Sequence, residues 1–256
     1  MVVQSLEGTI AAHPDCGVLL WGPRRLREIS GFQVATQRLD EDIEPIDKTA
    51  AIGLDQRASL IAREAAKERD RGIHTLILLE ENFIGGMRNN ILTGVFYPDV
   101  AHWLASFDSL LPMSPMRVTL GVRDYGAVWT SAYHYLPQSG RDVPDIARVR
   151  ATLMDNKRGW PQVANAAREV WPDADLMMWQ QEHLALSGAQ ICAQIMWISA
   201  EQIVIPNGNV NARKSTTARP TVFSSKERKG LSNRYNRHLR RMQSAGDCLW
   251  VGGDPE

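Results

Sequence analysis

An arginine and a serine eight positions apart are the first residues whose types and spacing suggest chemistry. Arg123 ends an apolar run at 118–122, and Ser131 lies in the helical pattern that follows. A guanidinium at the carboxyl end of a strand, beside the start of a helix, is well placed to bind a phosphate. The alternative is structural: Arg123 pairs with the predicted N-cap Asp124 or with another acid, and Ser131 only fills the helix.

A pair of carboxylates forms a second candidate. Glu80 and Glu81 directly follow the near-continuous apolar run 73–79, the pattern of a strand buried on both faces. A carboxylate at that position can act as a general base towards a hydroxyl group. The alternative is a carboxylate that caps the next turn or lies at the rim of the sheet.

The elements that position these residues alternate along the chain. Apolar spacing predicts strands at 17–21, 73–79, 117–122 and 175–179. It predicts helices at 2–12, 49–71, 98–111, 144–157, 161–171, 183–199 and 225–242, with a further helix opened by Asp124. The alternation predicts an α/β fold with a mainly parallel sheet, in which ligands bind beyond the carboxyl ends of the strands. Residues 206–225, rich in Asn, Ser, Thr, Gly and Arg, are predicted to form a long loop.

Composition indicates an ordinary globular protein. The chain has 256 residues, of which 44% are hydrophobic and 23% charged, and we expect one domain over 1–256. Three widely spaced cysteines argue against a disulfide framework or a zinc site and fit a reducing compartment. The sequence contains no apolar run long enough to span a membrane and no secretory signal, so we expect a cytoplasmic protein without a metal.

The zero net charge hides an uneven distribution. Ten Lys/Arg residues and one acid, Glu227, lie between 213 and 241. Such a basic segment suggests an anionic partner. The alternative is a solvated helix face.

The segment VTLGVRDYGAVWTSAYHYL, 118–136, resembles bacterial sulfotransferase-like proteins. In that family a strand ends in Arg, an Asp soon follows, and a Ser stands eight residues after the Arg in an aromatic-rich helix. The resemblance implies that Arg123 and Ser131 hold the 3′-phosphate of the donor, 3′-phosphoadenosine 5′-phosphosulfate. It also implies a three-layer sandwich with P-loop NTPase-like sulfotransferase topology.

Other segments are similar to the same family. LILLEENF, 76–83, looks like its strand that ends in Glu-Asn, which implies that Glu81 is the base and Asn82 its neighbour. DLMMWQQEHL, 175–184, resembles a later strand, and we interpret Glu182 as structural, an N-cap or an arginine partner. The acceptor is an unknown molecule that carries a hydroxyl group.

The family's strongest motif, a strand and a Lys-containing Gly/Ser/Thr-rich turn before the first helix, is not found. GNVNARKSTT, 208–217, lacks the second glycine, and Pro220 prevents a helix where a Walker motif needs one. Arg228-Lys229-Gly230, similar to another phosphate-binding tripeptide, is expected to be an exposed helix turn. We therefore expect a missing first strand: either the chain starts upstream, or the homologue is defective or repurposed.

Three functions remain open from the sequence. The first is a sulfotransferase-like protein that transfers, or once transferred, a sulfuryl group to a hydroxyl. The second is a non-catalytic protein whose basic segment 213–241 docks a polyanion such as nucleic acid or a sulfated glycan, although nucleic acid is the less expected partner. The third, a remnant of another P-loop transferase or kinase, is disfavoured because a Walker lysine is not found.

Overall fold

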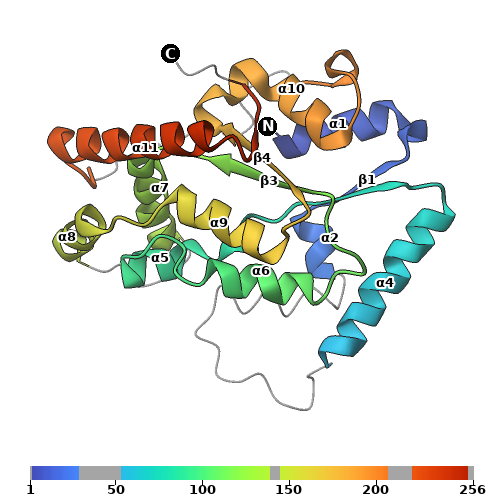
Figure 1. Ribbon diagram of the computed structural model, residues 1–256, viewed down its shortest axis with the longest axis horizontal. Helices are drawn as coiled ribbons and strands as arrows, with labels where there is room; N and C mark the ends of the chain where they lie inside the picture. Colours follow the sequence, from blue (N-terminus) through green and yellow to red (C-terminus); the bar gives the residue numbers. More distant parts are fainter. Residues whose placement is uncertain (1, 29–52, 139–144, 207–220, 253–256) are drawn as a thin grey trace.

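The computed structural model describes residues 2–28, 53–138, 145–206 and 221–252 of the chain. Helices and short strands alternate along it (Figure 1). The strands are β1 (Val18–Trp21), β2 (Thr75–Leu78), β3 (Arg117–Val122), β4 (Asp175–Gln180) and β5 (Leu249–Trp250). The α-helices are α1 (Val2–Ala12), α2 (Pro23–Glu28), α4 (Leu54–Asp70), α5 (Met87–Thr93), α6 (Val100–Asp108), α7 (Tyr125–Gln138), α8 (Ile146–Asp155), α9 (Trp160–Val170), α10 (Leu184–Met196) and α11 (Ser225–Ala245). Short 3-10 helices are η1 (Pro14–Cys16), η3 (Glu81–Ile84), η4 (Gln181–His183) and η5 (Ala200–Gln202).

Every strand pairing among the described residues is parallel. β1 pairs with β2, β3 with β4, and β4 with β5, which gives a two-stranded and a three-stranded sheet. Val18 faces Thr75 in the first pair, and Arg117 faces Asp175 in the second. The predicted α/β class is therefore confirmed.

Helices cover the strands on both faces. Figure 1 shows α1 and α10 on one side of the strands and α5, α6 and α9 on the other. Leu20 and Ile77 pack with Leu6 and Met196 on the first side. On the second side, Leu76 and Leu78 pack with Phe107 and Leu110. Alternate residues of each strand thus bury their side chains in opposite helix layers, as the two-residue period of a strand requires.

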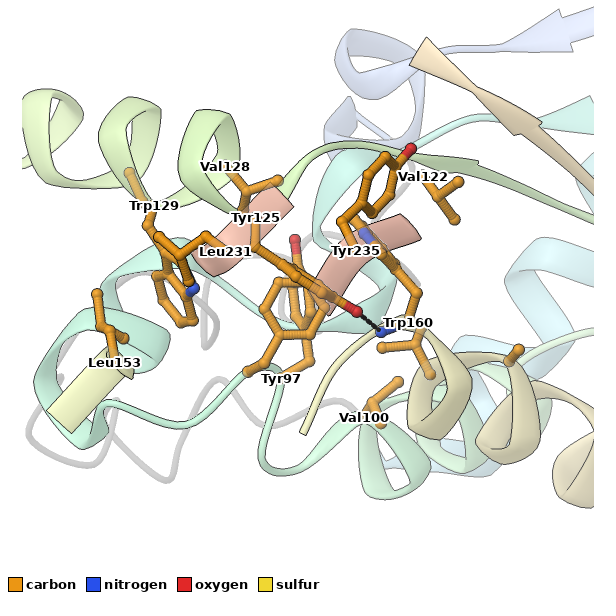
Figure 2. Packing of buried hydrophobic residues seen from close by; sticks show 14 of the residues in the cluster. Tyr97, Val100, Val122, Tyr125, Val128, Trp129, Leu153, Trp160, Leu231 and Tyr235 are labelled. Atoms are coloured by element: carbon orange, nitrogen blue, oxygen red, sulfur yellow. Dashed lines mark hydrogen bonds between the residues drawn. The ribbon is translucent and has the colours of Figure 1, made fainter. Parts of the chain in front are cut away.

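The largest apolar cluster lies under β3 and β4 and is built around aromatic rings. Phe96 meets Tyr125, Trp129 and Trp160 edge to face, with ring centroids 5.3, 5.6 and 4.9 Å apart. Each such pair contributes about 0.5–1.5 kcal/mol beyond area burial. Figure 2 shows Tyr125 and Trp160 side by side in this cluster. The start of α7 and the start of α9 are therefore fixed to one another.

Helix α11 shows how sequence dictates a boundary. Ser224 and Glu227 form the predicted capping box, with the Ser224 backbone N–H donating to the Glu227 carboxylate at 2.7 Å. Apolar residues four apart then face the cluster, including Leu231, Tyr235 and Leu239. The helix extends to Ala245, beyond the predicted end at 242. It ends there because Gly246 adopts a left-handed conformation, with φ 68°, and forms the C-cap.

Other boundaries differ from prediction by a few residues. α10 ends at Met196 rather than at 199, because the next residue, Trp197, adopts a left-handed conformation with φ 55°. The strand β5 was not predicted. Residues 207–220, which hold most of the predicted loop and the segment 208–217, lie outside the described residues. Within the described parts of the chain, helices are too short or too polar to cross a membrane.

Candidate functional site

The junction of β3 and α7 holds the first predicted site residue, Arg123. Its backbone carbonyl accepts a hydrogen bond from the Trp160 indole N–H at 2.8 Å, which fixes the end of the strand. Its side chain is half-buried. Among the described residues the guanidinium has no hydrogen-bond or ion-pair partner. A fixed backbone therefore presents a cationic group whose donors are unused within the described structure.

Asp124, the expected N-cap of α7, uses its carboxylate elsewhere. Its Oδ1 accepts from the backbone N–H of Ala127 at 3.1 Å, which confirms the cap. Its Oδ2 accepts from the Ser232 hydroxyl at 2.9 Å and so ties α7 to α11. The alternative in which Arg123 pairs with Asp124 is therefore not realised in the described structure.

Glu182, in η4 after β4, is the next acid at this edge. Its Oε1 accepts from the Asp124 backbone N–H at 2.7 Å, and its Oε2 accepts from the Tyr235 hydroxyl at 3.1 Å. Burial, followed by the negative charge of Glu182, raises the pKa of Tyr235 well above its ordinary value. Glu182 is therefore structural, as predicted, but it is neither an N-cap nor an arginine partner: it binds a backbone N–H and a tyrosine hydroxyl.

A second hydrogen-bonded group lies beneath the junction. The Tyr125 hydroxyl accepts from the Trp160 backbone N–H at 2.9 Å (Figure 2) and lies 2.7 Å from Nδ1 of His238. Burial raises the pKa of Tyr125. Burial and the nearby cations Arg237, Arg234 and Arg241 lower the pKa of His238 and so favour its neutral form. These groups hold α7, α9 and α11 together.

Ser131 lies on the exposed side of α7. It stands seven residues after Asp124, so it falls on nearly the same side of the helix, about 10 Å further along the axis. The structure thus places Arg123 and Ser131 on one strand–helix unit, although the described contacts do not join them directly.

The carboxyl end of β2 carries the third predicted residue. Glu80 is buried and caps η3, where one carboxylate oxygen accepts from the Asn82 backbone N–H at 3.3 Å and from its side-chain amide at 3.1 Å. Glu81 is exposed, and its charge adds to the effect of burial in raising the pKa of Tyr97. The capping role therefore falls to Glu80, and Asn82 binds Glu80 rather than Glu81.

The ends of β2 and β3 are connected through helices that pack against one another. β2 leads through η3 into α5, β3 leads into α7, and α5 packs against α7. Glu81 and Arg123 therefore precede two helices that pack together, although a direct contact between them is not part of the described structure.

Arg228 is a residue whose place sequence reasoning missed. The expected exposed helix turn at 228–230 is confirmed, since these residues are exposed within α11. The Arg228 side chain also passes beside Gly126, with its Cγ 4.0 Å from where a Cβ of Gly126 would stand. Arg228 thus contributes a second cationic side chain near the start of α7. The approach depends on the packing of α11 against α7, which no local pattern in the sequence signals.

The basic helix α11 divides its cations between two roles. Arg234 donates to the carbonyls of Leu153 and Met154 at 3.4 and 2.6 Å and to that of Asn156, which satisfies the end of α8. Other cations of α11 are exposed and make no described ion pair; they are Lys226, Arg228, Lys229, Arg237, Arg240 and Arg241. Arg213, Lys214 and Arg219 lie outside the described residues.

The described residues do not contain a group of three or more His, Cys, Asp and Glu side chains that could hold a metal ion. Comparison of the chain with protein-family models, with curated proteins and with solved structures gave no match. A proposal about the function therefore rests on the chemistry of the site itself.

Proposed function

We propose that the protein binds a 3′-phosphorylated adenine nucleotide at the carboxyl edge of β3, in the manner of a sulfotransferase-like protein. The observation that carries this proposal is the side chain of Arg123, half-buried at the end of a parallel strand and unpartnered among the described residues. Its obvious acidic partner, Asp124, is engaged by Ala127 and Ser232. A dianionic phosphate supplies the acceptor oxygens that this guanidinium lacks.

The surroundings of Arg123 favour an anion. The N-terminus of the 14-residue helix α7 begins two residues later, and its dipole favours negative charge. Arg228 approaches the same helix start from α11. Ser131 offers a hydroxyl on the side of Asp124. In this proposal Arg123 and Ser131 hold the 3′-phosphate of 3′-phosphoadenosine 5′-phosphosulfate, within a P-loop NTPase-like topology.

The reaction that such a donor serves is sulfuryl transfer. The acceptor hydroxyl oxygen bonds to sulfur, the bond from sulfur to the bridging oxygen of the 5′-phosphate breaks, and the hydroxyl proton passes to a base. Glu81 is the proposed base because it is exposed at the same edge, whereas Glu80 is occupied by its cap. Transfer also requires fixed positive charge at the 5′ end, which Glu81, Arg123 and Ser131 do not supply.

Calorimetric titration with adenosine 3′,5′-bisphosphate tests the proposal. We expect Arg123→Ala to weaken binding about tenfold to hundredfold, the effect of losing a charged hydrogen bond of about 1.5–3 kcal/mol. Arg69→Ala is the matched control, because that side chain is 77% exposed on α4. Absence of binding in the wild type, or equal binding by Arg123→Ala, would contradict the proposal.

A second function is favoured by the outer face of α11. Lys226, Lys229, Arg237, Arg240 and Arg241 fall within a stripe about 120° wide and about 22 Å long. The buried residues Leu231, Tyr235, Leu239 and Met242 lie opposite. None of the five cations is paired among the described residues. We propose that this basic stripe docks a sulfated polysaccharide.

Heparin affinity measured against salt tests the second function. We expect the logarithm of the affinity to fall linearly with the logarithm of the salt concentration, as counterions are released. Replacing Lys229, Arg237 and Arg240 together by Gln should reduce that slope, and Arg123→Ala should leave it unchanged. An affinity that does not change with salt would exclude the basic stripe as a docking site.

A further inference from the structure

The sheet is divided into two parts that do not bond to one another. β1 and β2 form one part, and β3, β4 and β5 form the other. β2 uses one edge for β1, and β3 uses one edge for β4. Each of these two strands therefore has a second edge without a hydrogen-bonded neighbour among the described strands.

The same helices cover both parts. Ile195 of α10 packs with Ile77 in one apolar cluster and with Met177 in another. On the opposite face, Leu104 of α6 belongs to the cluster under β3 and β4, whereas Phe107 belongs to that under β1 and β2. The two parts thus lie in one layer. α1 covers β1 and α10 covers β2 and β4, so the unpaired edges of β2 and β3 face one another.

The backbone groups that point between the two parts can be identified from the ladders. On β2, Thr75 and Leu79 donate their N–H groups to the β1 side, so the alternation of a parallel ladder directs those of Leu76 and Leu78 the other way. On β3, the Met116 carbonyl accepts from β4, so Thr119 and Gly121 face the opposite edge. Unpaired backbone groups within a helix-covered sheet are costly.

The burial of the strands also indicates a gap between β2 and β3. Strands of a parallel sheet with helices on both faces are normally buried. Leu176, Met177 and Met178 of β4 are buried, with at most 5% of each residue exposed. In contrast, β2 has no buried residue, and Thr119 in the middle of β3 is exposed. The two strands that flank the division are therefore less buried than β4, their neighbour in the three-stranded sheet.

We propose that a further parallel strand inserts between β2 and β3 and that the polypeptide directly N-terminal to α1 supplies it. α1 packs on β1 and is joined to its start by the short η1, so α1 begins near the carboxyl ends of the strands. Figure 1 shows α1 beside α10, the helix that returns from the end of β4. A parallel strand in the gap ends where α1 begins, so a short turn joins them.

The chemistry of that strand follows from its neighbours. It lies between α10 on one face and α6 on the other, so both sets of its alternating side chains are apolar. Its backbone pairs with Leu76 and Leu78 on one side and with Thr119 and Gly121 on the other. The inference does not depend on which ligand Arg123 binds.

Two measurements on the cellular protein test this proposal. Mass spectrometry of its N-terminal peptide should show residues encoded upstream of Met1. Residue-resolved hydrogen exchange should then compare that protein with the chain that begins at Met1. We expect the amides of Leu78 and Thr119 to exchange about a hundredfold more slowly in the longer protein.

Neighbouring amides provide the matched control. Ile77 and Leu120 donate to β1 and β4, so their exchange should be slow in both proteins. A cellular protein that begins at Met1, or equally fast exchange of Leu78 and Thr119 in the longer protein, would overturn the proposal. The proposal would also be overturned if, in the chain that begins at Met1, the exchange of Leu78 and Thr119 became slower as the protein concentration was raised. A second copy of the chain would then fill the gap. The N-terminal peptide decides the question even if the shorter chain does not fold.

Discussion

The carboxyl ends of β3 and β2 show opposite uses of polar side chains. At the end of β3 the acids Asp124 and Glu182 are saturated by backbone and hydroxyl donors, while the guanidinium of Arg123 is left without a described partner. At the end of β2 the buried acid Glu80 caps the turn η3, and the exposed acid Glu81 is the first residue of that turn. Acids at a strand end can thus bind backbone and hydroxyl donors, which leaves an adjacent arginine available for a ligand.

The largest expected effect tests how firmly the β3 end is built. Trp160→Ala removes an indole that fills the aromatic cluster and binds the Arg123 carbonyl, so we expect a loss of about 3–5 kcal/mol in the free energy of unfolding. Phe83→Ala at the β2 end, where the ring is half-buried, should cost less than about 2 kcal/mol. Urea denaturation measures both, and equal losses would contradict the expectation that the β3 end is the more firmly packed of the two.

A smaller effect is expected from Tyr125→Phe. It leaves the Trp160 backbone N–H without its acceptor in a buried position, which should cost about 1–3 kcal/mol. Tyr135→Phe on the same helix is the control, because Tyr135 is 42% exposed and the change should stay within about 0.5 kcal/mol. Thermal unfolding of both variants checks the prediction, and a neutral Tyr125→Phe would refute the role of the hydroxyl.

At the β2 end, removal of the two carboxylates should affect stability to different extents. Glu80→Ala removes a cap and should destabilise the protein by about 1 kcal/mol. Glu81→Ala should change stability by less than about 0.5 kcal/mol, because that side chain is exposed. Chemical denaturation of the pair decides the assignment, which is wrong if Glu81→Ala is the more damaging change.

The smallest expected effect is a pH dependence at the β3 end. The pKa of His238 is lowered in the folded protein, so the unfolded chain binds more protons as the pH falls below about 6.5. Stability should therefore decrease as the pH is lowered through the range between the unfolded and the folded pKa. His238→Asn keeps a hydrogen-bond acceptor for the Tyr125 hydroxyl and removes the titrating group. The free energy of unfolding of this variant should therefore change less between pH 7 and 5.5 than that of the wild type.

Local patterns predicted much of the fold. The apolar run before Arg123 and the cap at Asp124 gave the end of β3 and the start of α7 within one residue. The capping box at Ser224 gave the start of α11. These features depend on neighbours in sequence, which is why spacing reveals them. The two-residue strand β5 was not predicted because its pairing with β4 is long-range.

The candidate site was less accessible to sequence reasoning. Arg123 and Ser131 could be placed on one strand–helix unit, but which acids remain free depends on donors from distant elements, such as Ser232 and Tyr235. The approach of Arg228 to Gly126 likewise depends on the packing of α11 against α7. The division of the sheet into two parts likewise depends on which strands pair, which spacing in the sequence does not reveal.

The most direct test of the nucleotide site is the ratio of two affinities of the wild-type protein. Calorimetry with adenosine 3′,5′-bisphosphate and with adenosine 5′-monophosphate isolates the 3′-phosphate. If Arg123 binds that phosphate, the bisphosphate should bind about tenfold to hundredfold more tightly, and Arg123→Ala should abolish the difference. Equal affinities for the two nucleotides in the wild type would contradict the account.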